Sequence, residues 1–343
     1  MRKTVDWIRG LLFAVVCFGG GCGGVSSPPG EEVVVYTALD RVYAEPILQA
    51  FERDTGIRVR AKYDAEAAKT TGLINQIIAR ADAPECDVLW NNEVVQTQVL
   101  AGRGLIEPYR SPMADRFAAE HRDPEDRWTG FAARARVIIY NTDQLTAQQV
   151  PRSLAALTDP RWRGRVALAL PFFGTTLTHM VVLYGQWGEA RLTDWLGAVL
   201  DNQVAVAPGN GPVRDMVAAG EVPWGLTDTD DAHGAILDGK PVAVVVPDAG
   251  FGPVLIPNSV ALIAGAPHPD AGRKLIDYLL SAEVETRLAS SRSAQIPLGR
   301  DLAELATPWD GVVDRSSFGF DVVKAAADQA AVVELLREAG FDR

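Results

Sequence analysis

The stretch VVVYTALDRVYAEPILQAFERDTGIRVRAKY, residues 33–63, decides the fold. It opens with a continuous apolar run at residues 33–36, which predicts a buried strand. Apolar residues then recur at helical spacing over residues 47–51, with Pro46 expected in the first turn of the helix. Residues 57–63 alternate between apolar and polar, as a half-buried strand does. Together these patterns predict a strand–helix–strand unit of an α/β protein.

The same alternation of strands and helices continues after this unit. We therefore expect a mainly parallel sheet with helices on both faces, and ligands at the loops that leave the carboxyl ends of the strands. A second region is expected to begin near Trp128, and the chain to cross back to the first region near residue 259. The further predicted strands are residues 87–90, 136–140, 166–170, 204–206, 224–227, 242–246 and 259–263, and the further helices are residues 73–78, 95–100, 176–187, 190–200, 271–281 and 321–340.

Length and composition narrow the class of protein. The chain has 343 residues, enough for two ordinary domains, and its 48% hydrophobic content is that of a globular protein rather than a disordered or fibrous one. Acidic residues outnumber basic ones by 44 to 33, which gives a formal net charge of −11 and argues against a protein that binds nucleic acid. Three cysteines are too few for a disulfide scaffold.

The N-terminal segment has the layout of a secretory signal peptide. Basic residues precede a short apolar run at residues 11–18, and small residues precede Cys22. We expect a lipoprotein signal peptide over residues 1–21, a lipidated Cys22, and a flexible linker over residues 22–30; an ordinary signal peptide is the alternative. Cys86 would then be the remaining free thiol, and we expect it in the core.

Polar segments follow several of the predicted strands. Because the carboxyl ends of parallel strands lie at one edge of a sheet, such segments can face one another across a cleft. They are residues 37–43 (TALDRVY), 90–93 (WNNE), 171–176 (PFFGTT), 209–211 (GNG) and 227–233 (TDTDDAH).

The last of these segments gathers three carboxylates, those of Asp228, Asp230 and Asp231. Like charges this close repel one another, so a nearby hard cation would stabilise them. The alternative is a solvated acidic turn in which Asp230 caps the following helix. Trp90 and Trp224 lie next to polar segments. They could line a pocket for an organic cation, or they could belong to the core.

Two other segments come just before helices and contain glycine. The backbone N–H groups that begin a helix favour anions, although plain helix capping explains the same residues. Neither Gly174-Thr175-Thr176 nor Gly209-Asn210-Gly211 matches a P-loop or a GxGxxG pattern. The chain also lacks an HExxH or a GxSxG motif, so it carries no recognisable catalytic signature.

Eight segments stand in an order that is typical of one family: VVVYTALD (33–40), FERDTGIRVR (51–60), ADAPECDVLWNNE (81–93), VLAGRGLIEPY (99–109), WTGFAARARVIIYNTDQL (128–145), LTDPRWRGRVALALP (157–171), MVAAGEVPWGLTDTDD (216–231) and IPNSVALIAGAPHPDAGRKLIDYLLSAEVE (256–285). In this order the chain resembles the periplasmic solute-binding proteins of ABC importers, in particular the ferric-iron-binding type.

The resemblance implies a two-lobed α/β periplasmic-binding-protein fold, type II-like, with a ligand cleft between lobes that crossing strands join. We expect lobe 1 to comprise residues 31–130 plus 258–308, and lobe 2 residues 131–257 plus 309–343. The implied role is a periplasmic or extracytoplasmic receptor with no reaction or cofactor of its own, anchored to the membrane by Cys22, monomeric, and serving an ABC permease and ATPase.

The resemblance also implies a binding site. Asp40 stands where the iron proteins often have a histidine, Asn92 or Glu93 where they have a glutamate, and Asp230 and Asp231 where they have adjacent tyrosines. An anion that completes the iron shell would lie at three further positions, Gly174, Thr175 and Asn210.

Because aspartates replace the tyrosines, the identity of the ligand stays open. Asp40, Glu93, Asp230 and Asp231 could bind ferric iron or another metal cation, with the metal as cargo. The same carboxylates could instead hold an organic cation, and the anion positions could hold a phosphorylated small molecule. An extracytoplasmic hydrolase that uses these carboxylates is a further alternative, for which the chain offers no nucleophile motif.

Overall fold

The computed structural model describes residues 31–342, except 65–70, 249, 251 and 316–319. The expected signal peptide, the lipidated Cys22 and the linker that follows lie outside the described residues and stay predictions. The chain from residue 31 onward forms one compact unit. The boundaries expected for the two lobes therefore also stay predictions.

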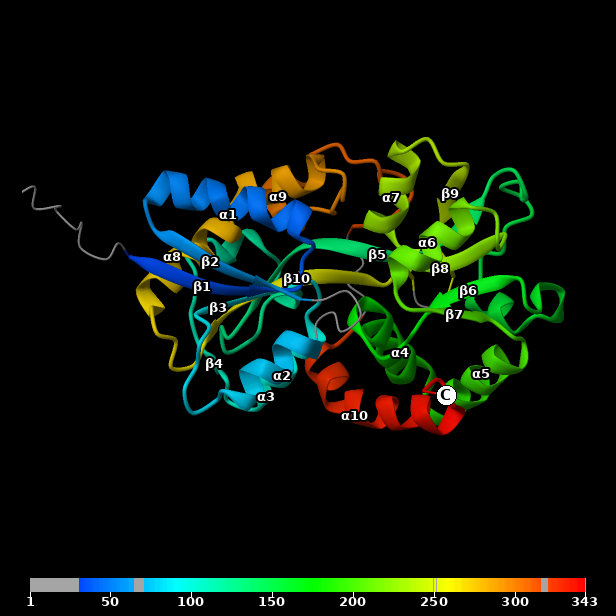
Figure 1. The fold of residues 1–343 in the computed structure, drawn as a ribbon, viewed down its shortest axis with the longest axis horizontal. Helices are drawn as coiled ribbons and strands as arrows, with labels where there is room; N and C mark the ends of the chain where they lie inside the picture. The colour runs from blue at the N-terminus through cyan, green and yellow to red at the C-terminus, as the bar shows by residue number, and fades with distance from the viewer. Residues whose placement is uncertain (1–30, 65–70, 249, 251, 316–319, 343) are drawn as a thin grey trace, which may run out of the picture. The chain divides into compact units, whose positions relative to one another are not determined.

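Ten strands form one connected sheet in the order β2-β1-β3-β10-β5-β8-β6-β7, in which β4 also pairs with β10 and β9 with β5. Figure 1 shows β1, β2 and β3 at one end of this sheet and β6, β7 and β8 at the other, with β5 and β10 between them. The strands are β1 (Glu32–Thr37), β2 (Arg58–Tyr63), β3 (Val88–Asn91), β4 (Ile106–Glu107), β5 (Thr129–Asn141), β6 (Val166–Ala169), β7 (Ala205–Ala207), β8 (Trp224–Asp228), β9 (Val242–Val245) and β10 (Leu255–Ile263).

The sheet is mixed, so the expectation of a mainly parallel sheet is wrong. β1 pairs in parallel with β2 and β3, and β6 pairs in parallel with β7 and β8, as βαβ units require. The pairs that involve β5 and β10 are all antiparallel. These two strands carry the chain from one end of the sheet to the other and back, and the local apolar pattern contains no information on strand direction.

β5 changes partners along its length. Its first half, from Thr129 to Ala135, pairs with β10, and its second half, from Arg136 to Asn141, pairs with β8 and β9. All 13 residues of β5 are buried. The change of partner falls at Ala135 and Arg136, so this point is a switch in sheet topology, which is where α/β proteins commonly bind ligands.

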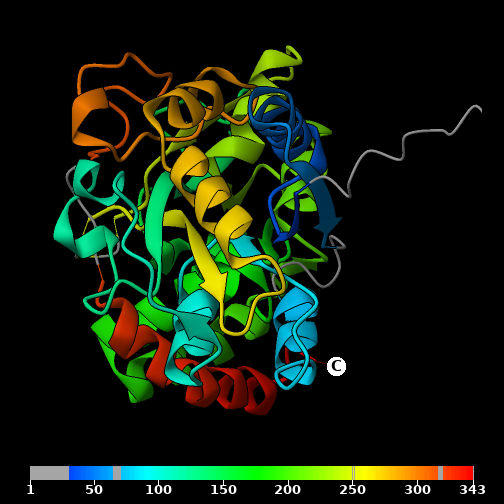
Figure 2. The ribbon, with the colours of Figure 1, turned by 90° about the vertical axis from the view of Figure 1, so that its left-hand side faces the viewer.

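Helices cover both faces of the sheet (Figures 1 and 2). In Figure 2, α1 and α9 lie above the strands and α2 and α10 below them. α10 packs against α3, α4 and α5 and so spans both ends of the sheet. The helices are α1 (Arg41–Thr55), α2 (Thr71–Ala79), α3 (Val95–Gly102), α4 (Gly174–Trp187), α5 (Glu189–Asp201), α6 (Asn210–Ala218), α7 (Thr229–Leu237), α8 (Pro269–Leu279), α9 (Ala282–Ser290) and α10 (Val322–Ala339).

Two predictions need correction, and one helix was not predicted. α1 begins at Arg41, so Pro46 lies inside the helix and not in its first turn. The helix expected at residues 271–281 is α8, and a separate helix that was not predicted, α9, follows it, because Ser281 accepts a hydrogen bond from the backbone N–H of Val284 and starts α9. The acidic segment after β8 is not a loop, because Asp228 ends β8 and α7 begins at Thr229 and includes Asp230 and Asp231.

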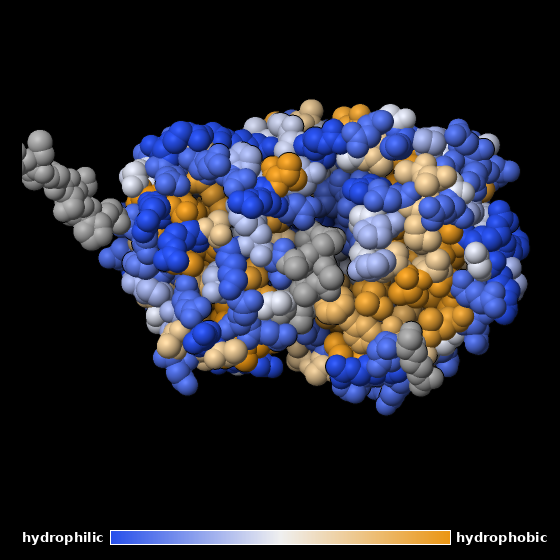
Figure 3. Space-filling model, viewed as in Figure 1, coloured by the Kyte–Doolittle hydropathy of each residue, from blue (hydrophilic) through white to orange (hydrophobic). Residues whose placement is uncertain are grey.

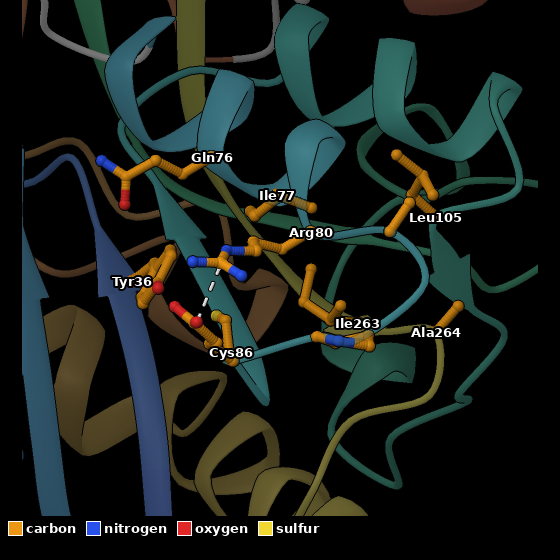
Figure 4. A pocket seen from close by; sticks show the side chains of 11 residues that line it. Tyr36, Gln76, Ile77, Arg80, Cys86, Leu105, Ile263 and Ala264 are labelled. Carbon is orange, nitrogen blue, oxygen red and sulfur yellow. Dashed lines mark ion pairs between the residues drawn. The ribbon is translucent and has the colours of Figure 1, made fainter.

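The interior confirms the expected roles of the apolar side chains. Trp90 and Trp224 are both 0% exposed, so they belong to the core and wall no pocket. Cys86 is a buried free thiol, 2% exposed, and Figure 4 shows it beside Tyr36 and Ile77 in a small cavity. That cavity, of about 10 Å³, has room for one water molecule at most, so it is too small for a ligand.

Within the described part of the chain, every helix is too short or too polar to cross a membrane.

Candidate ligand-binding site

Two buried arginines mark the point where β5 changes partners. Arg134 is 2% exposed and Arg136 is 1% exposed. Both project from a strand whose other residues are almost all apolar, where an unpaired charge would be very costly. Each therefore has a carboxylate partner from the end of β8 or the start of α7: the Nε atom of Arg134 lies 3.0 Å from Asp230, and the Nη1 atom of Arg136 lies 2.6 Å from Asp228.

Asp228 is the centre of a buried polar network. Besides Arg136, its carboxylate accepts hydrogen bonds from the Thr175 hydroxyl and from the Asn210 amide, the latter at 2.9 Å. Thr175 lies in the first turn of α4, which begins at Gly174 with a φ of 51°, and Asn210 begins α6. The structure thus brings both predicted anion-binding side chains together, and their polar groups contact the protein's own carboxylate.

The guanidinium of Arg136 is only partly satisfied by this network. Its Nε and Nη2 atoms are buried and have no hydrogen-bond partner among the described residues. The Nδ1 atom of His179, on α4, is also buried and without a hydrogen bond in the described part of the chain. Burial, followed by the charge of Arg136, lowers the pKa of His179 well below its usual range, so this imidazole is neutral.

Asp230 and Asp231 lie in the first turn of α7 and line a polar pocket. The pocket has a volume of about 170 Å³, and Asp40 and Tyr43, at the start of α1, line it from the other side. Figure 3 shows a hollow lined by hydrophilic side chains between the positions of α1 and α7. The remaining lining residues are Arg214, Asp215, Ala218, Gly234, Ala235, Asp238, Lys240 and Arg292.

Acidic groups outnumber basic ones around this pocket. Five aspartates line it against two arginines and one lysine. The arginines pair with three of the carboxylates: Arg214 lies 2.8 Å from Asp215 and 3.4 Å from Asp231, and Arg292 lies 2.7 Å from Asp238. Burial and the nearby carboxylates of Asp230 and Asp40 raise the pKa of Tyr43, so its phenol is protonated at neutral pH. The pocket is thus suited to a ligand that carries positive charge.

The three aspartates that the sequence singled out form a compact group. Asp228, Asp230 and Asp231 each offer one oxygen atom, and these oxygens lie within 4.8 Å of one another. Hard cations prefer such oxygen donors. In the described structure each of the three carboxylates also faces an arginine, namely Arg136, Arg134 or Arg214.

Glu93 lies elsewhere and is fully enclosed. It is 0% exposed, and its carboxylate accepts hydrogen bonds from the backbone N–H groups of Val95 and Gln96, at 2.7 and 3.0 Å, at the start of α3. The amide of Asn91 and the hydroxyl of Thr178, on α4, also donate to it, at 3.0 and 2.9 Å. Burial raises the pKa of Glu93 to about 7 despite these four donors.

The predicted site residues therefore fall into separate groups. Asp40 joins Asp230 and Asp231 at the pocket, whereas Thr175 and Asn210 join Asp228 beneath it. Gly174 begins α4, and Asn92 is buried with its carbonyl accepting a hydrogen bond from Arg134. The group of three aspartates includes neither Asp40 nor Glu93. The ligand roles of all eight residues stay predictions.

Arg134, Arg136 and Tyr43 are not among the residues predicted for the site. A signal for the arginines was present, because two charges at positions i and i+2 of an apolar strand must find buried partners. Tyr43 ends the segment 37–43 that is expected to face the cleft, and its side chain lines the pocket.

A family model described as "Bacterial extracellular solute-binding protein" matches residues 91–313. The Fe(3+)-binding periplasmic protein of Serratia marcescens is 28% identical over 216 residues, which are 63% of this chain and 62% of that protein. The chain thus matches somewhat less than two thirds of that relative's length.

Solved structures share the fold. Iron-bound HitA from Pseudomonas aeruginosa superposes with a TM-score of 0.77 at 21% identity, over 90% of this chain and 99% of HitA. The periplasmic binding protein AfuA from Actinobacillus pleuropneumoniae, solved with exogenous fructose-6-phosphate bound, superposes with a TM-score of 0.74 at 20% identity, over 91% and 98% of the two chains. Both likenesses bear on the fold, which is the mixed α/β periplasmic-binding-protein fold that the sequence predicted.

Proposed function

Because this chain belongs to the bacterial extracellular solute-binding proteins, which bind solutes and catalyse no reaction, we propose that it is the periplasmic cargo receptor of an ABC importer. In this proposal it binds a small solute in the pocket between α1 and α7 and delivers it to a membrane permease. The relative from Serratia marcescens is named a periplasmic protein, which supports the proposed compartment. Anchoring through Cys22 belongs to the same proposal.

We propose a hard metal cation, ferric iron first, as the cargo. The observation that supports it is the group of oxygens from Asp228, Asp230 and Asp231, beside a pocket that Asp40 also lines. The named relative is an Fe(3+)-binding protein and HitA was solved with iron bound, which is consistent with this cargo. A bound cation would take over the carboxylates of Asp230 and Asp231 from Arg134 and Arg214, since a trivalent charge attracts a carboxylate more strongly than a guanidinium does.

A thermal-shift titration tests the metal cargo. Fe³⁺, supplied as its nitrilotriacetate chelate, is expected to raise the Tm of the protein by several degrees, because a ligand that binds only the folded state stabilises it. The double variant Asp230→Ala/Asp231→Ala should lose this rise. The matched control is Asp194→Ala/Asp201→Ala, which removes the same charge from exposed positions on α5. An unchanged rise in the first variant would contradict the site.

A phosphorylated solute is the second candidate, and one observation favours it. Arg136 keeps two buried nitrogen atoms without a hydrogen-bond partner among the described residues, next to Thr175 and Asn210 at the starts of α4 and α6. Such donors suit a phosphate group. The same titration with fructose 6-phosphate in place of iron decides between the candidates. A rise in Tm with the sugar phosphate and none with Fe³⁺ would select the second.

A further inference from the structure

A β-bulge interrupts the first half of β5, two residues before Arg134. The register of the pairing with β10 shifts between Pro257 and Asn258, and Ala132 is left out of the ladder. Ala132 has a φ of 42°, a left-handed conformation that residues other than glycine adopt rarely. A bulge bends its strand and re-aims the side chains next to it. Because this conformation is strained for alanine, groups around Ala132 have to hold it in place.

The side chain of Glu285, on α9, holds the bulge from one side. It is 0% exposed, and its carboxylate accepts a hydrogen bond from the backbone N–H of Ala132 at 3.0 Å. The same carboxylate accepts hydrogen bonds from the backbone N–H groups of Leu298 and Gly299, at 2.9 and 3.1 Å, and lies 3.2 Å from the guanidinium of Arg116. Four donors fix this carboxylate, so Ala132 is tied firmly to α9.

On its other side the bulge is linked to Arg134. The side-chain amide of Asn258 donates a hydrogen bond to the carbonyl of Ala132, and its oxygen accepts one from the Nη2 atom of Arg134 at 3.3 Å. The Nε atom of Arg134 in turn lies 3.0 Å from Asp230, which lines the pocket. A continuous chain of contacts therefore runs from Glu285, which does not line the pocket, to a carboxylate that does.

Arg134 competes with a cationic cargo for Asp230. The guanidinium is 2% exposed, so its pairing with this carboxylate offsets the burial of its charge. A cation that takes over the carboxylate leaves the guanidinium buried with one partner fewer, which opposes binding. The more firmly Arg134 is held on Asp230, the weaker the binding of the cargo and the faster its release.

We propose that Glu285 is a positioning residue that limits the affinity for the cargo: it holds the bulge at Ala132, the bulge keeps Arg134 on Asp230, and a cation has to displace Arg134 in order to bind. The inference rests on the proposed function, and it concerns the release of the cargo rather than its identity. A receptor that delivers a cation to a permease gains from such a limit, because a competing arginine that recaptures the carboxylate favours release.

Glu285→Gln tests the inference by loosening the bulge from a distance. An amide NH₂ group accepts no hydrogen bond, so two of the four donors lose their acceptor whichever way the glutamine faces. We expect the variant to be less stable and yet to bind Fe³⁺, supplied as its nitrilotriacetate chelate, about tenfold more tightly, the factor that one hydrogen bond to a charged group represents. Calorimetric titration well below the Tm measures the affinity, and urea unfolding measures the stability.

The direction of the change in affinity separates this role from two simpler ones. The variant removes a negative charge, which by itself would weaken the binding of a cation. A purely structural role for Glu285 would lower the stability and give no tighter binding. Only the release of Asp230 from Arg134 combines tighter binding with a less stable fold.

A double-mutant cycle tests whether Glu285 acts through Arg134. Arg134→Met should also bind Fe³⁺ more tightly, because it removes the competitor. Adding Glu285→Gln to Arg134→Met should raise the affinity no further, while it still lowers the stability. Glu283→Gln is the matched control: it removes the same charge from a side chain of α9 that is 55% exposed, and it should change neither quantity noticeably.

The outcomes separate this inference from the proposed function. If wild-type protein binds Fe³⁺ but Glu285→Gln binds it no more tightly, or if the effects of Glu285→Gln and Arg134→Met on affinity add up, the metal cargo stands and the role of Glu285 is overturned. If wild-type protein does not bind Fe³⁺, both proposals fail. Should Glu285→Gln not fold, the same gain in affinity is required between Ala132→Gly and Ala132→Gly/Glu285→Gln, since glycine adopts a positive φ without strain.

Discussion

After β3, the carboxylate of Glu93 is enclosed at the start of α3; after β8, the carboxylates of Asp230 and Asp231 line a pocket at the start of α7. Both segments consist of polar residues that follow a buried strand, and both precede a helix. The two segments differ in the groups that interact with their carboxylates. Glu93 receives four hydrogen bonds, two of them from backbone N–H groups. Asp230 and Asp231 each pair with a partly or fully buried arginine, and Asp230 accepts one backbone hydrogen bond, from Asp231.

This difference distinguishes a structural carboxylate from one that can exchange its partner. A helix start leaves several backbone N–H groups without acceptors, and a buried carboxylate that takes them up is part of the fold. An arginine partner can be replaced by another cation without breaking the backbone. Asp228 is enclosed like Glu93, since it is 3% exposed, but all of its donors named here are side chains, those of Arg136, Thr175 and Asn210.

The largest effect on stability is expected from Arg136→Met. This change leaves Asp228 buried without its countercharge, which costs about 3–5 kcal/mol of unfolding free energy in comparable pairs. We expect about 3 kcal/mol, because the Nε and Nη2 atoms of Arg136 have no partner among the described residues and their burial is relieved. Urea unfolding measures the change.

Two further variants check the cause of this loss. Adding Asp228→Asn to Arg136→Met removes the orphaned charge and should recover part of the lost stability. Arg287→Met breaks the exposed pair with Glu283, in which both side chains are roughly half exposed, and should change stability far less. If Arg136→Met lowers the free energy of unfolding no more than Arg287→Met does, the network around Asp228 contributes little to the stability of the fold.

The link between Glu93 and α4 should give an intermediate effect. Thr178→Val removes one donor to a buried carboxylate, which costs about 1.5–3 kcal/mol when the acceptor is charged. The pKa of Glu93 is raised to about 7, so the folded protein keeps a proton that the unfolded chain loses near pH 4.5. The unfolding free energy contributed by this group therefore falls as the pH rises from about 4.5 to about 7.

The variant should consequently lose more stability at pH 8, where Glu93 is ionised, than at pH 5, where it is protonated. Thermal melts at both values measure the difference. Thr193→Val is the control, because the Thr193 hydroxyl donates to the backbone carbonyl of Glu189 and contacts no carboxylate. Equal losses for Thr178→Val at the two pH values would show that Glu93 stays in one charge state.

The fold was largely predictable because its signals are local. Apolar periodicity places most strands and helices within a few residues, and a glycine, Gly56 in the left-handed conformation, ends α1. Strand direction is not local, so the antiparallel β5 and β10 could not be read from periodicity. The site was predictable in part: Asp40, Asp230 and Asp231 do meet at one pocket, but their arginine partners come from other elements that only the folded chain brings near.

The smallest effect on stability, and the sharpest test of the comparison, is expected from Asp231→Asn. The pair with Arg214 is 3.4 Å long and its side chains are 25% and 29% exposed, so its loss should cost about 0.5 kcal/mol, with a few tenths more from the lost charge at the start of α7. If Asp231 holds cargo, the same variant should lose most of the Fe³⁺-induced rise in Tm. Urea unfolding and the thermal-shift titration, made on one preparation, measure the two effects. A large loss of stability with an unchanged response to iron would be the opposite result. It would show that Asp231, like Glu93, has a structural role and does not bind the cargo.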